Sequence, residues 1–133
     1  MKILMIGFLL VVVQCAMGQH FVVRVENIKD DRGQIGVAIY SSEKDYMKKR
    51  FAGKFVPAKK GTVEIIFENL PTDFYAVTVM HDSNSNEKLD TNLIGIPKEG
   101  YGFSNNVKGT FGPPSFDQAK FKLGGEVVIK MLY

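Results

Sequence analysis

Apolar and polar residues alternate along most of the chain after residue 20, and this period of two predicts β-strands. In FVVRVEN, Phe21, Val23 and Val25 would share one face, whereas Arg24 and Glu26 would point the other way. The same alternation occurs in GQIGVAIYS, TVEIIFEN, AKFKL and GEVVIKMLY. The run FYAVTVMHD is apolar on both faces, so we expect it to be a central strand.

Short connections rich in turn-forming residues separate these strands. The sequence DDRG, residues 30–33, has turn chemistry. Ser42 and Asp45 fit a capping box that would open a short helix over EKDYMKKR. Short strands, one short helix and turns rich in Gly and Pro indicate a single all-β domain, either a sandwich or a barrel.

A different pattern occupies the first 18 residues. Lys2 precedes the apolar run ILMIGFLLVVV, and QCAMGQ with its small residues follows, which is typical of a secretory signal peptide. The run is shorter than the ~20 apolar residues of a membrane-spanning helix. We therefore expect a signal peptide over residues 1–18 and a domain over residues 19–133, with no transmembrane segment after cleavage. A buried N-terminal strand is the alternative.

Cysteine content and charge bear on location and partners. Cys15 is the only cysteine, and cleavage after Gly18 would leave an exported, periplasmic or extracellular chain without disulfides. Lipid anchoring through Cys15 is the alternative, although Gln14 stands where a lipoprotein signal has a small residue. The net charge of +3 comes from scattered lysines rather than from one basic face, so we expect no nucleic-acid partner.

The stretch from residue 83 to residue 118 breaks the alternation and is rich in Gly and Pro. Structureless connections beyond ~12–15 residues are uncommon in compact domains and are usually functional or disordered. This one carries large apolar residues, among them Leu93, Ile94, Ile96, Tyr101, Phe103, Phe111 and Phe116. We expect such residues to order the loop by packing on the domain; a ligand surface that includes His81, Tyr101, Phe103 and Asn105 is the alternative.

Oxygen-bearing side chains recur at alternate positions at the start of this stretch. Counted from Asp82, oxygens fall at positions 1, 3, 5 and 9 (Asp82, Asn84, Asn86 and Asp90), and Lys88 at position 7 would offer its carbonyl. This matches the first nine positions of a calcium loop, because Ca²⁺ binds 6–8 oxygens at roughly 2.3–2.6 Å. The sequence thus predicts a weak calcium site.

Two positions depart from the calcium-loop pattern. Glu87 stands at position 6, where the loop has Gly, and Leu93 stands at position 12, where it has a bidentate Glu. Asn92 and Glu99 are candidates for the missing ligand. A metal-free turn rich in Asn and Asp is the alternative interpretation.

His81 is the residue on which an enzymatic hypothesis would depend. It shares the strand face of Tyr75, Val77 and Val79, so a hydrogen-bonded structural role is the simpler interpretation. The alternative is a hydrolase that uses His81 with Glu99, or a metal-activated water. The context GFSNN lacks the nucleophile-elbow pattern G-x-S-x-G.

The longest motifs resemble a known bacterial family. FENLPTDFYAVTVMHDSNSNEKLDTNLIGIPKEGYGFSNN, followed by GPPSFDQAKFKL, is similar to the bacterial domain-of-unknown-function family 2141. The resemblance implies a secreted or periplasmic β-sandwich of uncertain function. Together with the strand pattern, we expect a single antiparallel sandwich of about seven strands, Ig-like or transthyretin-like. Glu87 departs from the Gly that the family's loop often has, and Asp73 stands where related sandwiches often have Gly.

The functional expectation is accordingly broad. The first hypothesis is a non-enzymatic, calcium-stabilised module that binds a sugar, a peptide or an envelope protein. It rests on a sandwich scaffold with an elaborated loop and no complete catalytic set. The hydrolase described above is the second hypothesis.

Overall fold

A computed structural model describes residues 20–133 of the protein. The predicted signal peptide, its cleavage site and Cys15 lie outside the described residues. Within residues 20–133, no helix has the length and apolar character needed to cross a membrane.

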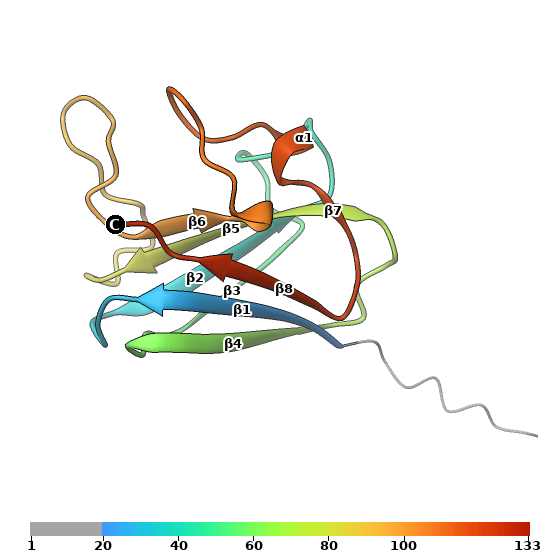
Figure 1. The fold of residues 1–133 in the computed structure, drawn as a ribbon, viewed down its shortest axis with the longest axis horizontal. Helices are drawn as coiled ribbons and strands as arrows, with labels where there is room; N and C mark the ends of the chain where they lie inside the picture. The colour runs from blue at the N-terminus through green and yellow to red at the C-terminus, as the bar shows by residue number, and fades with distance from the viewer. Residues whose placement is uncertain (1–19) are drawn as a thin grey trace, which may run out of the picture.

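Two layers of β-sheet form the domain (Figure 1). The strands are β1 (His20–Ile28), β2 (Gln34–Tyr40), β3 (Ala52–Pro57), β4 (Gly61–Glu68), β5 (Phe74–Asp82), β6 (Tyr101–Phe103), β7 (Phe121–Lys122) and β8 (Glu126–Lys130). The first sheet has the order β4-β1-β8, and the second has the order β3-β2-β5-β6, with β7 paired to β5. All pairs are antiparallel except β1 with β8, which is parallel. The predicted all-β sandwich is confirmed.

The hydrophobic core lies between the two sheets and consists of the predicted strand faces. Phe21, Val23 and Val25 of β1 are almost completely buried, as are the alternate residues of β2, β4 and β5. The polar residues between them point outward because successive side chains of a strand alternate between its faces. Strand β5 lies between β2 and β6, as its apolar character on both faces predicts.

The short helix is not where the capping pattern predicts it. Ser42 Oγ does accept a hydrogen bond from the Asp45 N–H at 3.2 Å. Residues 43–48 nevertheless form only turns, because Met47 takes a left-handed conformation with φ of 60° that ends helical propagation. The helix is instead α1 (Phe116–Ala119), which opens on a capping box made by Ser115 and Gln118.

Helix α1 covers one end of the outer face of the second sheet. Phe116 and Ala119 pack on Ala76 of β5. The ring of Tyr46 lies edge-on between Tyr40 and Phe116, with centroid distances of 5.5 and 5.8 Å. The remainder of that outer face is left open by the helix.

The long stretch after β5 is not one loop. Strand β6 and the 3-10 turn η1 (Ser104–Asn106) pin its middle to the sandwich, because β6 pairs with β5. Two loops remain, residues 83–100 and residues 107–115, and both rise on the same side of the ribbon in Figure 1.

Candidate functional site

A groove crosses the open part of the outer face of the second sheet, with a volume of about 360 Å³. Its floor follows from strand register. One cross-strand row runs Phe55, Gly36, Met80, Tyr101, and the next row runs Gly53, Ala38, Thr78, Phe103. On the two middle strands, β2 and β5, three of the four floor residues are small, namely Gly36, Ala38 and Thr78, and Met80 is the fourth. The aromatic residues Phe55, Tyr101 and Phe103 lie on the flanking strands β3 and β6. We call this hollow the outer-sheet groove.

Two glycines of the groove are in close contact with neighbouring side chains. A methyl group on Gly36 would lie 2.6 Å from the ring of Phe55 and 3.3 Å from the terminal methyl of Met80. A methyl group on Gly53 would lie 2.8 Å from Cδ of Arg50. The two glycines thus let neighbouring side chains lie flat over the sheet, where a Cβ would displace them.

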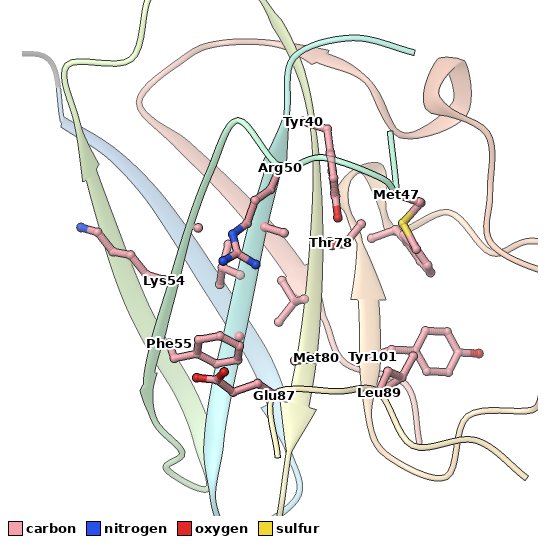
Figure 2. Close-up of a pocket in the computed structure, with 16 residues that line it drawn as sticks. Tyr40, Met47, Arg50, Lys54, Phe55, Thr78, Met80, Glu87, Leu89 and Tyr101 are labelled. Carbon is pink, nitrogen blue, oxygen red and sulfur yellow. The ribbon is translucent and has the colours of Figure 1, made fainter. Parts of the chain in front are cut away.

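Three charged residues line the groove, which are Arg50, Lys54 and Glu87. The Lys54 side chain points away and donates to the Ile66 carbonyl, whereas Arg50 and Glu87 reach over the groove from different parts of the chain (Figure 2). Arg50 comes from the connection between β2 and β3, and Glu87 comes from the loop after β5. Among the described residues, neither side chain makes a hydrogen bond or an ion pair with another side chain. An apolar hollow with one unpaired cation and one unpaired anion is suited to bind a ligand that has polar groups as well as an apolar body.

Two of the groove's lining residues have left-handed backbones. Met47 has φ of 60° and Glu87 has φ of 62°, a region that favours glycine. Glu87 is the residue that stands in place of Gly in the calcium-loop pattern. The loop therefore makes its turn without glycine, and it carries a carboxylate to the groove instead.

Asp82 fixes the loop from which Glu87 comes. This carboxylate is fully buried at the end of β5. Its oxygens accept hydrogen bonds from the backbone N–H groups of Asn86 at 3.0 Å and Glu87 at 2.8 Å, and from the side-chain amide of Gln34 at 2.8 Å. A buried carboxylate with three donors is a stable anchor for a turn.

The other oxygens of the predicted calcium loop also converge. The amide groups of Asn84 and Asn86 donate to Asp90 at distances of 2.6 to 3.2 Å. These hydrogen bonds hold the pKa of Asp90 below its usual value. The side-chain oxygens of Asn84 and Asn86 in turn accept the N–H groups of Asn86 and Lys88. The cluster is therefore held together by its own hydrogen bonds.

This geometry fits a calcium ion only in part. Asp82 and Asp90 could supply carboxylate oxygens, whereas the two amides present their NH₂ groups to Asp90. If the side-chain amides of Asn84 and Asn86 rotated by half a turn, each would present its oxygen to the ion. These oxygens would then lose the hydrogen bonds that they now accept from backbone N–H groups. Within residues 20–133, no three His, Cys, Asp or Glu side chains are grouped as metal ligands.

The two candidates for the missing ligand have different positions. Glu99 is buried and accepts from Ser83 Oγ and from the Asp90 N–H, both at 3.2 Å, so it ties the two ends of the oxygen-rich segment together. Asn92 lies in the next turn, where its oxygen accepts the N–H groups of Ile94 and Ile96. Glu99 thus lies beside the cluster, and the Asn92 oxygen serves another turn.

His81 is packed inside the sandwich, with 2% of its surface exposed. Its Nε2 bonds the carbonyl oxygen of Arg32 at 2.7 Å, so this nitrogen is the donor. The hydroxyl of Tyr133, whose pKa is raised by burial, lies 2.7 Å from Nδ1 and donates to it. Both ring nitrogens are engaged, and no hydrogen bond joins His81 to Glu99 or Ser104 in the described part of the chain.

The run Gly-Phe-Ser-Asn-Asn forms hydrogen bonds with strand β5 and with the end of helix α1. Ser104 accepts from the Val77 N–H and donates to the Ala119 carbonyl. Asn105 donates to the carbonyls of Gln118 and Lys120 at the end of α1. Of the four predicted ligand-surface residues, Tyr101 and Phe103 line the outer-sheet groove, whereas His81 and Asn105 do not.

Sequence reasoning missed the groove floor and Arg50. The available signal was in GQIGVAIY, where the outward positions 36 and 38 hold Gly and Ala rather than polar residues. Small apolar residues on an outward face are unusual for a solvated strand. The groove itself depends on four strands aligning such positions, which requires the pairing register.

Comparison with protein families gives a match over most of the chain. The model described as "Uncharacterized protein conserved in bacteria (DUF2141)" matches residues 23–130. Comparisons with curated proteins and with solved structures found no match. The match runs from Val23, within β1, to Lys130 at the end of β8 and includes the groove and the oxygen-rich loop, so the predicted resemblance is confirmed. The chain belongs to this uncharacterized bacterial family, DUF2141.

Proposed function

We propose that the protein is an exported, non-enzymatic binding module whose ligand lies in the outer-sheet groove. The observation that carries this proposal is the arrangement of the groove: a floor of Gly, Ala and Thr, walls of aromatic and Met side chains, and the charges of Arg50 and Glu87 above it. Ligand pockets are typically hollows of 300–1,000 Å³ with apolar walls and few polar groups.

The groove favours a ligand of a particular chemistry. The rings of Tyr101 and Phe103 meet edge to face at 6.0 Å and offer an apolar wall. Arg50 would pair with an anionic group of the ligand, and Glu87 would accept from a donor group. An apolar body with an anion and a donor is the chemistry of a short peptide, which is one of the partners expected from the sequence.

Backbone conformation supports the assignment independently. Left-handed conformations of non-glycine residues cost free energy and tend to occur at ligand sites. Met47 and Glu87 both have this conformation and both line the groove. A turn built only for stability would favour Gly at these positions.

The environment of His81 supports a non-enzymatic role. Catalysis by His81 would require a free ring nitrogen close to a nucleophile or to a water. Its two nitrogens are instead bonded to Tyr133 and Arg32 inside the sandwich.

Export is a proposal that rests on the N-terminal sequence. N-terminal sequencing of the periplasmic fraction should find a chain that begins at Gln19.

Titration with the fluorescent dye anilinonaphthalene sulfonate tests the groove, because the dye combines an apolar aromatic body with one anion. Ala38→Leu fills the floor and should weaken dye binding by about tenfold or more. Val128→Leu, which enlarges an exposed side chain on the other sheet, is the matched control. Equal dye affinity of the Ala38→Leu variant and the wild-type protein would contradict the proposal.

The same titration tests the role of Arg50. Arg50→Gln should weaken binding of the anionic dye by about tenfold, the effect of losing one charge-assisted hydrogen bond. Lys49→Gln removes the same charge from the neighbouring residue, which does not line the groove, and should leave binding unchanged. If both variants lose affinity equally, the effect is general electrostatics rather than a contact in the groove.

We propose in addition that the oxygen-rich loop binds Ca²⁺ weakly, with Asp82, Asn84, Asn86, Asp90 and the Lys88 carbonyl as ligands. Convergence of these side chains supports it, and the present amide orientation argues for low affinity, around the ~10⁻⁴–10⁻³ M of extracellular modules. Isothermal titration with calcium chloride, with magnesium chloride as control, tests it. If the titration releases no heat and the melting temperature is the same in calcium and in chelator, the loop is a metal-free turn.

A further inference from the structure

We infer that the two loops on one side of the sandwich dock the protein on an anionic lipid surface, independently of the outer-sheet groove. The tip of each loop carries large apolar side chains that no other part of the described chain covers. Leu93, Ile94 and Phe111 are 106%, 80% and 103% exposed. The sequence predicted that such residues would pack on the domain, and for these three that prediction is wrong.

The first tip is a rigid turn rather than a loose loop. Asn92 accepts the N–H groups of Ile94 and Ile96 through its side chain, and its own N–H donates to the Ile96 carbonyl at 2.8 Å. Gly95 takes φ of 84° to close the turn. Leu93 and Ile94 are thereby held outward, while the backbone N–H groups of the tip other than that of Leu93 are already bonded. This lowers the cost of moving the tip into a medium poor in water.

The second tip is pinched at its base in a similar way. A methyl group on Gly109 would overlap the carbonyl oxygen of Gly112, so the two backbones touch where the loop closes. Thr110 and Phe111 are left at the end of the loop. Phe111 was expected to fold onto the sandwich, but the closed base and the following Pro113 direct it away.

Charge on the two tips matches an anionic surface. From Thr91 to Lys98 the only charged residue is Lys98, and from Val107 to Ser115 the only charged residue is Lys108. Asp90 and Glu99 flank the first tip, but their carboxylates lie at its base, where Asp90 accepts the Asn84 and Asn86 amides and Glu99 is buried. Both lysines are exposed. An apolar tip with a basic residue beside it is the arrangement by which proteins lie at a lipid headgroup layer, and each lysine near that layer adds attraction to anionic lipids.

The shape of the surface favours lipid over a second protein. A stable protein interface buries a continuous area of roughly 800 Å² on each partner. Here the exposed apolar residues Leu93, Ile94 and Phe111 belong to two loops, and these loops protrude separately from the sandwich in Figure 1. Mobile lipid headgroups can rearrange around each loop separately. A protein partner would instead need two pockets with the same spacing as the two loops.

Flotation with lipid vesicles tests this inference on the full chain. Vesicles of phosphatidylglycerol and phosphatidylcholine should bind the protein, and vesicles of phosphatidylcholine alone should bind it more weakly. Ile94→Asp and Phe111→Asp should each lower binding by about tenfold or more. Ile66→Asp, which changes a half-exposed residue on the outer face of the first sheet, is the control and should bind as the wild-type protein does.

Lysine variants test the electrostatic part of vesicle binding, and thermal melting tests whether the tip variants are folded. Lys98→Gln and Lys108→Gln should reduce binding to the anionic vesicles and its sensitivity to salt. The Ile94 and Phe111 variants should melt as the wild-type protein does, because their side chains are exposed. The inference fails if the wild-type protein does not float with anionic vesicles, or if the tip variants still do. It also fails if the tips instead drive self-association that Ile94→Asp abolishes, with no vesicle binding.

Discussion

The buried carboxylate of Asp82 accepts the backbone N–H of Glu87 at 2.8 Å, and the side chain of Glu87 lines the outer-sheet groove. The end of a central strand therefore determines one wall of the candidate binding site. The oxygen-rich segment serves the groove through this bond whether or not it also binds calcium.

Asp82→Ala should lower the free energy of unfolding by about 3 kcal/mol, because it leaves three partly buried donors, from Asn86, Glu87 and Gln34, without their acceptor. Denaturant unfolding followed by circular dichroism measures this. Asp117→Ala, at an exposed residue whose one ion pair is with Lys120, is the control and should change stability by less than about 1 kcal/mol. Similar losses in the two variants would mean that Asp82 does not anchor the loop.

Glu87→Gly should be more stable than Glu87→Ala by about 1 kcal/mol. Both variants lose the carboxylate, but only glycine adopts the left-handed conformation of residue 87 without a steric penalty. Thermal melting of the pair isolates the backbone effect. Equal melting temperatures would show that residue 87 is not held in this conformation in solution.

Stability should fall in acid in a way that depends on Asp90. Hydrogen bonds from Asn86 and Asn84 lower the pKa of this carboxyl in the folded protein. A group with a lowered folded pKa stabilises the fold at pH values above its unfolded pKa of about 3.9, and that contribution is lost as the pH falls through the folded pKa. Asp90→Asn cannot titrate, so its stability should change less than that of the wild-type protein as the pH falls from neutral to below the unfolded pKa of about 3.9. Parallel curves for the two proteins would contradict the assignment.

Tyr133→Phe should cost about 1 kcal/mol of folding free energy, because it leaves Nδ1 of the buried His81 without its donor. Tyr101→Phe is the control, since the Tyr101 hydroxyl makes no hydrogen bond within the described residues. Chemical denaturation distinguishes the two. A loss confined to Tyr101→Phe would show that His81 is not anchored by Tyr133 and would reopen the enzymatic hypothesis.

The core could be predicted from the sequence because the strand period places every second residue on one face. Phe21, Val23 and Val25 illustrate this, since their burial follows from local alternation alone. Strand β3 escaped prediction because Ala52–Pro57 is an edge strand with few buried side chains, and its sequence AGKFVP has no clean alternation. Strand β6 escaped it because three residues are too few for a pattern.

The candidate site was predictable only where it depends on neighbours in sequence. The oxygens of Asp82, Asn84, Asn86 and Asp90 do converge, since a tight turn brings alternate residues together. The outer-sheet groove brings residues 36, 53, 78 and 101 together from four strands, and no local pattern encodes that register. Tertiary context likewise overrode the capping box at Ser42, where Met47 turns left-handed and points into the groove region instead of continuing a helix.

Amide chemical shifts of the ¹⁵N-labelled protein during titration with anilinonaphthalene sulfonate test the central claim most directly. This measurement separates the outer-sheet groove from the exposed tips at Leu93 and Phe111, which could also attract an apolar dye. We predict that the largest shifts occur at Gly36, Ala38 and Thr78, on the groove floor. Shifts confined to the loop tips or to the strands of the first sheet would contradict a ligand site in the groove.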